Sequence, residues 1–102
     1  MSRKYAAKVD ANQSEIVAAL RAVGASVDPC HAVGAGFPDL AVGFRGANYF
    51  IEVKDGRKPP SDRKLTAAQV EWHGAWRGQV AVVTSVAEAL RVVGVRITEA
   101  EA

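Results

Sequence analysis

Three residues suited to metal-assisted hydrolysis of phosphodiester bonds lie close together in the sequence: Asp39, Glu52 and Lys54. Asp39 follows a proline and precedes an apolar segment, while Glu52 and Lys54 are two residues apart at the end of a second apolar segment. Magnesium is usually held by one or two carboxylates together with water and phosphate oxygens. A lysine ammonium at such a site can orient an attacking water and offset phosphate charge. These residue types therefore predict phosphodiester hydrolysis with Mg²⁺ or Mn²⁺.

The two apolar segments, Leu40–Phe44 and Tyr49–Val53, predict a β-hairpin that positions the three residues. Both are rich in β-favouring residues, and the four residues between them, Arg-Gly-Ala-Asn, are typical of a turn. Successive side chains of a strand point to opposite faces. Any even-numbered loop therefore keeps Asp39 on the face of Glu52 and Lys54 and leaves the other face apolar. An odd loop without a bulge would direct Asp39 into the core.

In these residues the chain resembles the PD-(D/E)XK nuclease superfamily, and within it the small stand-alone phage type of virus-type replication-repair nuclease domain. The resemblance covers about residues 34–93. It is carried by Gly-Phe-Pro-Asp-Leu at 36–40, Ile-Glu-Val-Lys at 51–54, Leu-Thr-Ala-Ala-Gln at 65–69 and Val-Ala-Val-Val-Thr-Ser at 80–85. Glu-x-Lys alone is a weak motif, and the accompanying Gly-x-Pro-Asp at hairpin distance makes the combination more specific.

The resemblance implies metal-dependent cleavage of DNA on a restriction-endonuclease-like α/β sandwich, with a mixed central sheet and a catalytic hairpin flanked by helices. Asp39 and Glu52 would be metal ligands, the backbone carbonyl of Val53 a further ligand, and Lys54 the catalytic lysine. Small phage members resemble Holliday-junction resolvases and act as homodimers. The expected partner is therefore DNA, in a branched form, bound by a homodimeric endonuclease.

Members of this family add a glutamate from the first helix and a glutamine from the helix after the motif, here Glu15 and Gln69. Both residues also have a structural explanation, because Asn12 with Glu15 and Thr66 with Gln69 fit the capping box, in which the third helical residue bonds back to the cap. Gln69 also shares a helical face with the two tryptophans, and inward-facing tryptophans would direct it toward the sheet. For both residues the sequence leaves catalysis and capping open.

Periodicity and capping signals predict the elements around the hairpin. They are a helix at 11–23, a short strand at 26–29, a helix at 66–77, a strand at 80–84 and a short helix from Ser85 to near Gly94. With the hairpin, this order favours an α/β fold with a mixed sheet. Residues 55–65 contain Pro59 and Pro60 and few apolar side chains, and they predict a mobile loop over the site.

Basic residues gather on both sides of the predicted site. They lie in the basic N-terminal tail, residues 1–10, and in the predicted loop: Arg3, Lys4 and Lys8, and Arg57, Lys58, Arg63 and Lys64. Lysine and arginine at such places can neutralise phosphates and release counterions. We therefore predict contacts with DNA phosphates, and a solvated tail and loop is the alternative.

Composition limits the remaining possibilities. The 102 residues suit one domain, and a formal net charge of +2 by itself identifies no partner. No apolar run approaches the roughly 20 residues that span a bilayer, and the first residues lack the apolar core of a signal peptide. Cys30 is the single cysteine, which excludes an intramolecular disulfide. We expect a cytoplasmic protein without membrane contact, and the resemblance implies a phage or prophage protein in a bacterial host.

Other functions receive less support from the sequence. It contains neither a Walker-type phosphate loop nor a Gly-x-Ser-x-Gly elbow. Cys30, His31 and His73 lack the paired spacing of zinc ligands. Trp72 and Trp76 could stack on unpaired bases, although packing in a core or a dimer interface is the commoner use. The leading alternative to a nuclease is a protein of the same fold that binds DNA or a partner without cutting.

Overall fold

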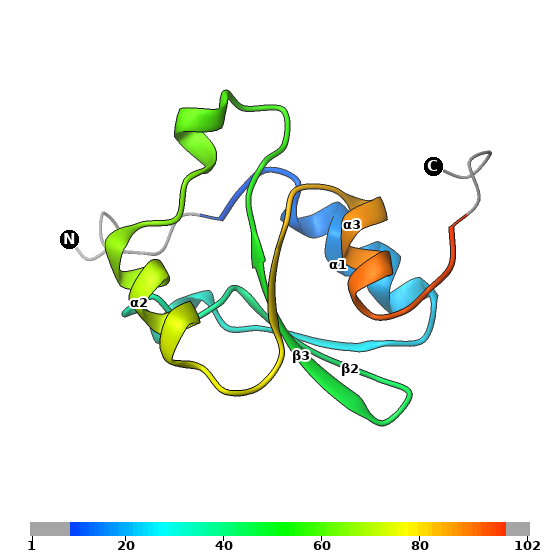
Figure 1. Cartoon of the computed structure of the whole chain (residues 1–102). Coiled ribbons are helices and arrows are strands. Elements are labelled where there is room, and N and C mark those ends of the chain that lie inside the picture. The colour runs from blue at the N-terminus through cyan, green and yellow to red at the C-terminus, as the bar shows by residue number, and fades with distance from the viewer. Residues whose placement is uncertain (1–8, 98–102) are drawn as a thin grey trace.

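The computed structural model describes residues 9–97 of the chain. In this range the elements follow the predicted order, with two additional single-turn 3₁₀ helices, η2 and η3 (Figure 1). Their bounds are α1 (Gln13–Ala22), β1 (Ser26–Pro29), η2 (His31–Val33), β2 (Leu40–Phe44), β3 (Ala47–Val53), η3 (Pro60–Arg63), α2 (Ala67–Ala75), β4 (Val80–Val83) and α3 (Val86–Val92). None of these helices is long and apolar enough to span a membrane.

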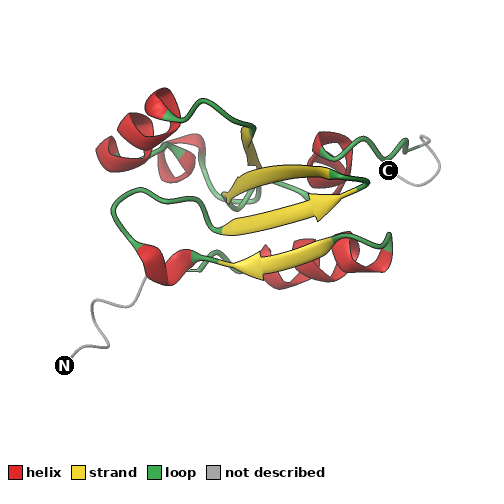
Figure 2. Cartoon of the chain, turned by 90° about the horizontal axis from the view of Figure 1, so that it is seen from below, coloured by secondary structure: helices red, strands yellow, loops and turns green. Residues whose placement is uncertain are grey.

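The four strands form one mixed sheet in the order β1-β2-β3-β4. β2 pairs with β1 and β3 in antiparallel orientation, whereas β3 and β4 are parallel and α2 connects them. Helices α1 and α3 lie on one side of the sheet and α2 on the other (Figure 1). Seen from below, helical segments lie above and beneath the strands (Figure 2). The prediction of an α/β fold with a mixed sheet flanked by helices is confirmed.

The core lies between the sheet and the pair α1 and α3. Alternate residues of the hairpin are buried there, and the helices add side chains about one turn apart: Leu40, Val42, Phe44, Ile51 and Val53, with Ile16, Leu20, Ala89 and Val93. Each fully buried large aliphatic side chain contributes about 1.5–3 kcal/mol. A slip of the hairpin by one residue would turn this whole apolar set to the other face, so the core also fixes the strand register.

The hairpin turn is shorter than the sequence predicts. β3 begins at Ala47 instead of Tyr49, and the loop consists of Arg45 and Gly46 alone. These two residues have φ angles of 51° and 82°, and a two-residue type I′ turn requires positive φ at both. The four-residue turn was a wrong prediction because Ala and Asn are poor strand formers by propensity, which pairing with β2 overrides here.

The pairing register decides which side chains share the face opposite the core. Leu40 pairs with Ile51, so Asp39 and Glu52 occupy facing positions at the next step along the two strands. The loop has an even number of residues, as the face argument required. The prediction that Asp39, Glu52 and Lys54 lie on one face of the hairpin is confirmed.

Asn12 attaches the start of α1 to the sheet. The helix begins at Gln13 and not at residue 11, and the Asn12 side chain makes no capping hydrogen bond. Its Nδ2 instead donates to the carbonyl oxygens of Lys54 and Thr84, both at 3.2 Å. The predicted capping box of Asn12 with Glu15 is therefore wrong, because a buried Asn12 side chain satisfies the ends of β3 and β4 instead of its own helix.

Helix α2 is shorter than predicted at its C-terminal end. It stops at Ala75 because Trp76 leaves the helical region, with φ −74° and ψ 131°. The backbone N–H of Trp76 still donates to the carbonyl oxygen of Trp72 at 3.0 Å. This bond completes the last turn of α2 and fixes the position of the Trp76 backbone.

Residues 55–65 connect β3 to α2 and contain η3 but no α-helix or strand. Their first residue, Asp55, is buried and accepts hydrogen bonds from Arg57: from the backbone N at 2.9 Å, from Nε at 3.0 Å and from Nη2 at 3.1 Å. These bonds close a tight turn at the end of β3. The predicted mobility of this connection stays a prediction.

Candidate active site

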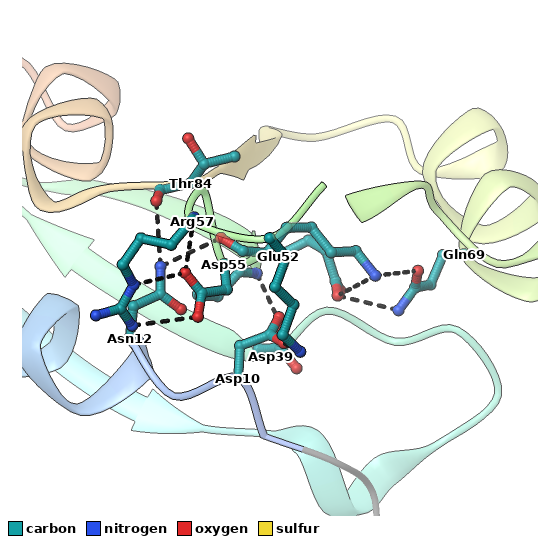
Figure 3. Close-up of polar contacts among 11 residues, drawn as sticks. Asp10, Asn12, Asp39, Glu52, Asp55, Arg57, Gln69 and Thr84 are labelled. Atoms are coloured by element: carbon teal, nitrogen blue, oxygen red, sulfur yellow. Dashed lines mark hydrogen bonds and ion pairs between the residues drawn. The ribbon is translucent and has the colours of Figure 1, made fainter. Parts of the chain in front are cut away.

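Asp39, Glu52 and Lys54 line one hollow of about 320 Å³ at the end of the hairpin opposite its turn (Figure 3). Val53 and Gln69 line the same hollow. Asp39 directly precedes β2, and Glu52 and Lys54 lie at the end of β3. Gln69 comes from the first turn of α2, far away in the sequence. The fold thus brings together four of the five residues predicted as catalytic.

Backbone groups hold Asp39 in place. Its Oδ2 accepts a hydrogen bond from the backbone N–H of Val53 at 2.8 Å, and its carbonyl oxygen accepts one from Cys30 at 2.6 Å. The preceding residue, Pro38, is fully buried, and its ring restricts φ. The carboxylate is therefore fixed against β3, next to Glu52, before any ligand binds.

Glu52 is the most perturbed carboxyl group of the site. Its side chain is 3% exposed, and Oε2 accepts a hydrogen bond from Gln69 Nε2 at 3.0 Å, whereas the buried Oε1 has no hydrogen-bond partner. Burial, followed by the charge of the neighbouring Asp39 carboxylate, raises its pKa to about 8 against the opposing effect of Lys54. A buried carboxylate with an unpartnered oxygen is unfavourable unless a cation or a proton neutralises it.

Gln69 links Lys54 to Glu52. Its Oε1 accepts from Lys54 Nζ at 3.0 Å while its Nε2 donates to Glu52, and Lys54 Nζ lies 3.6 Å from Glu52 Oε2. The same Oε1 accepts from the backbone N–H of Thr66 at 2.9 Å, and Thr66 Oγ1 accepts from the N–H of Gln69 at 3.2 Å. The predicted capping box of Thr66 and Gln69 is confirmed, and the capping side chain also contacts the site.

The residues in the hollow fit a hard divalent cation. Asp39 and Glu52 supply carboxylate oxygens, and Glu52 Oε1 is a buried acceptor without a partner. Across residues 9–97, no three His, Cys, Asp or Glu side chains converge as a metal-binding group. Two carboxylates suit Mg²⁺, which keeps several water and phosphate ligands, whereas structural zinc sites take four protein ligands.

Glu15 is the predicted catalytic residue that the fold places elsewhere. It is exposed on α1 and lines a separate hollow with Asp55, Arg57 and Thr84. Because Asn12 attaches the start of α1 to the ends of β3 and β4, Glu15 faces the turn that follows β3. The structure therefore does not bring Glu15 together with Asp39 and Glu52.

Sequence reasoning missed Asp10 and His31, which both line the hollow. Asp10 Oδ1 lies 3.4 Å from Lys58 Nζ, so its carboxylate already has a positive partner. His31 begins η2 directly after Cys30, and pairing of β1 with β2 brings this point next to Asp39. The predicted strand at 26–29 could have revealed His31, whereas no sequence signal fixes the path of the chain before α1.

Cys30 and His73, two of the residues considered for zinc, lie in different surroundings. The thiol of Cys30 donates to the carbonyl oxygen of Asp28 at 3.3 Å, and burial raises its pKa. His73 lies on α2, where burial and the nearby charge of Lys54 lower its pKa. These positions give no structural support to a soft-metal site.

The predicted DNA-binding residues differ in how free their charges are. Arg57 is ion-paired with Asp55, and its hydrogen bonds hold the pKa of that carboxyl below its usual range. Lys58 pairs with Asp10, Arg63 is half-buried, and Lys64 is exposed. The other predicted residues, Arg3, Lys4 and Lys8, lie outside the described part of the chain.

The raised pKa of Glu52 predicts how stability depends on pH without metal. An unfolded glutamate titrates near pH 4.3, so between about pH 4.3 and 8 the Glu52 carboxyl binds more protons in the folded protein than in the unfolded chain. The free energy of unfolding should therefore fall as pH rises through this window, by at most ~1.4 kcal/mol per pH unit from this group. Thermal unfolding in chelator between pH 5 and 8.5 measures it.

Glu52→Gln is the control for this pH dependence, since it keeps the side-chain shape and removes the titration. The variant should lose the part of the fall that Glu52 causes, whereas titration of every other group remains in both proteins. Identical pH profiles of the two proteins would show that Glu52 keeps an ordinary pKa.

The hollow therefore combines two adjacent carboxylates, a lysine and an amide that orients both Lys54 and Glu52. Such a set can hold a hard cation, neutralise phosphate charge and direct a water toward a phosphorus atom. The functional interpretation rests on this geometry, because no protein-family model, curated protein or solved structure matches the chain.

Proposed function

We propose that this chain is a metal-dependent DNA endonuclease with a restriction-endonuclease-like fold, of the virus-type replication-repair kind. The observation that carries the proposal is the buried Oε1 of Glu52, which has no hydrogen-bond partner although the Asp39 carboxylate lies next to it. The charge of Asp39 raises the free energy of ionising Glu52, and a divalent cation relieves that repulsion. Lys54 supplies one positive charge of its own.

Each site residue has a role in the proposed reaction. Asp39 and Glu52 hold the ion, with the backbone carbonyl of Val53 as a further oxygen donor. A bound Mg²⁺ or Mn²⁺ supplies Lewis-acid polarisation of the phosphoryl oxygen. Lys54 positions the attacking water and offsets phosphate charge, and Gln69 keeps Lys54 and Glu52 in place.

The resemblance to small phage nucleases extends the proposal to the substrate and the assembly. We propose a homodimer that binds branched DNA, as a phage or prophage protein in the cytoplasm of a bacterial host. In a dimer with two-fold symmetry, two copies of the hollow can act on two strands and give paired incisions.

The proposal is tested with labelled four-way junction, flap, linear duplex and single-stranded DNA, each with magnesium, manganese or chelator. We expect cleavage that requires metal and is fastest, with paired incisions, on the junction. Cleavage in chelator would contradict the metal site. DNA binding without cleavage of any substrate would instead favour the alternative, a binding protein that retains the fold but does not cut.

Salt dependence tests the predicted phosphate contacts of residues 55–65. Lys64→Gln should lower the slope of log affinity against log salt concentration by about 0.9, the value for one lost phosphate contact on duplex DNA. Arg57→Gln should lower it less, because Asp55 already pairs with Arg57. Binding is measured in chelator by fluorescence anisotropy at several salt concentrations.

Arg91→Gln is the matched control for these variants. Arg91 is exposed in the last turn of α3, on the other side of the sheet from α2. Its replacement should leave the slope unchanged. Equal slopes for the wild-type protein and Lys64→Gln would identify residues 55–65 as ordinary solvated surface.

A further inference from the structure

A second, larger hollow of about 650 Å³ lies on the same face of the sheet as the carboxylates. Gly43 and Asn48 of the hairpin, Phe50 of β3, and Trp76 and Gln79 after α2 line it. Helices α1 and α3 cover the opposite face, so these side chains are outside the core.

Small residues make room in the sheet at this place. Gly43 has no side chain, and a Cβ placed there would meet Asn48 Oδ1 at 3.5 Å, an ordinary contact. Ala41, two residues earlier on β2, points to the same face. The floor of the hollow is therefore formed by backbone and small side chains, with the Asn48 amide at one side. The backbone at Gly43 would accept a larger residue without strain.

Trp76 forms an aromatic wall of the hollow. Its ring stacks on Trp72 with centroids 4.7 Å apart and an interplanar angle of 15°, and Phe50 contacts it edge-on at 5.1 Å. Trp72 covers one face of the Trp76 indole, yet Trp76 remains 41% exposed. Neither packing in the core nor packing against α2 accounts for this exposed aromatic surface.

The Trp76 ring is held before any ligand arrives. Its backbone N–H is bonded to Trp72, and the chain at Gly78 passes so close that a Cβ there would lie 2.8 Å from Trp76 Nε1. A stacking surface that is already ordered loses little conformational entropy on binding.

The hollow lies beside the proposed active site on the same face of the sheet. Asp39 and Gly43 lie on the same face four residues apart, which is about 13 Å at roughly 3.3 Å per residue. Phe37, which lines the carboxylate hollow, contacts Phe50 at 5.2 Å, and Phe50 in turn contacts Trp76. At a rise of about 3.4 Å per stacked nucleotide, the two hollows are roughly four nucleotides apart.

The charges near the hollow are mixed. Arg77, which directly follows Trp76, is exposed, and Asp28 of β1 lines the hollow. Arg45, at the hairpin turn, places its guanidinium over the ring of Phe44, a core residue. The hollow combines ring surface with amide groups of Asn48 and Gln79. Unpaired bases are recognised by this combination of aromatic stacking with polar groups that reach the base edge.

We infer that the hollow beside Trp76 binds an unpaired base of the same DNA strand whose phosphate lies at Asp39 and Glu52. This inference rests on the proposed function and specifies its substrate: DNA with unpaired nucleotides near the cleaved bond. The exposed face of Trp76 stacks on the base, and Gly43 leaves room for its edge.

The test measures binding without cleavage, in chelator, with a single-stranded oligonucleotide and a blunt duplex of the same sequence. The chain has two tryptophans, so intrinsic fluorescence reports directly on this place. We expect the single strand to quench the fluorescence more than the duplex does. Trp76→Leu should weaken single-strand binding about 5- to 150-fold, the range for loss of one stacked base, and leave duplex binding unchanged.

Two further variants separate stacking from general damage. Gly43→Val fills the floor at a place where the atoms nearest to the added Cβ belong to Asn48 and Ser26, and it should also weaken single-strand binding alone. Val70→Ala removes an exposed apolar side chain of α2 outside the hollow and should change nothing. Circular dichroism and thermal unfolding confirm that each variant is folded.

Two results would overturn the inference. One is an equal effect of Trp76→Leu on single-stranded and duplex DNA, or no effect on either. The other is a change of oligomeric state in Trp76→Leu with single-strand binding retained, which would identify the hollow as an interface between copies. Because all binding is measured in chelator, failure of metal-dependent cleavage is seen separately and concerns the proposed function.

Discussion

Replacing Glu52 by glutamine is expected to reduce metal-dependent DNA cleavage by at least about a thousandfold while the protein stays folded. The substitution removes one of the two carboxylates proposed to hold the ion, and Lewis-acid catalysis then loses its site. The amide can still accept the hydrogen bond from Gln69, which the carboxylate receives at 3.0 Å. It also relieves the repulsion with Asp39 that raises the pKa of Glu52. Stability at pH 8 in chelator should therefore be equal or higher.

Glu15→Gln is the matched control, because it makes the same chemical change on an exposed residue outside the hollow. Cleavage is measured on the preferred substrate with magnesium and with manganese, and ion affinity is measured by calorimetry. Loss of both cleavage and ion binding in Glu52→Gln alone would support the site. Full activity of Glu52→Gln would remove Glu52 as a ligand, and equal loss in Glu15→Gln would give Glu15 a catalytic role that its position does not explain.

The hairpin shows what the sequence determines well. Strand alternation and an even loop placed Asp39 on the face of Glu52, although the loop length itself was wrong. The position of Asp39 on the face of Glu52 depends only on whether the loop has an even number of residues. The length of the loop depends on whether Arg45 adopts a positive φ. A non-glycine residue seldom does so, and propensity therefore favoured the longer turn.

The residues around the hairpin were harder to predict because their positions depend on tertiary contacts. Asn12 has the chemistry of a helix cap, yet its side chain binds two carbonyl oxygens at the ends of other strands. That contact directs Glu15 away from the hollow, and no local pattern shows it. Gln69, by contrast, lies in the first turn of α2. The sequence predicted its capping box with Thr66 and its direction toward the sheet, and it left a role in catalysis open.

Gly36, in the segment before Asp39, allows two parts of the backbone to pack closely together. A Cβ at Gly36 would lie 2.3 Å from the carbonyl oxygen of Ala68 and 3.0 Å from the backbone N of Gln69. Gly36 therefore allows the segment before β2 to pack directly on the first turn of α2. That contact sets the distance between Gln69 and Glu52.

Gly36→Ala is accordingly expected to destabilise the protein by roughly 3 kcal/mol, from a positive φ of 83° and a backbone clash that no side-chain rotation relieves. Gly46→Ala is the control, since its φ is also positive, 82°, but no atom lies within 4 Å of the added Cβ. It should cost only the strain of the positive φ, about 1 kcal/mol. Urea unfolding gives both values, and equal values would show that α2 yields without penalty. If α2 does shift, Gly36→Ala should also lose cleavage at temperatures where it remains folded, because Gln69 then no longer links Lys54 to Glu52.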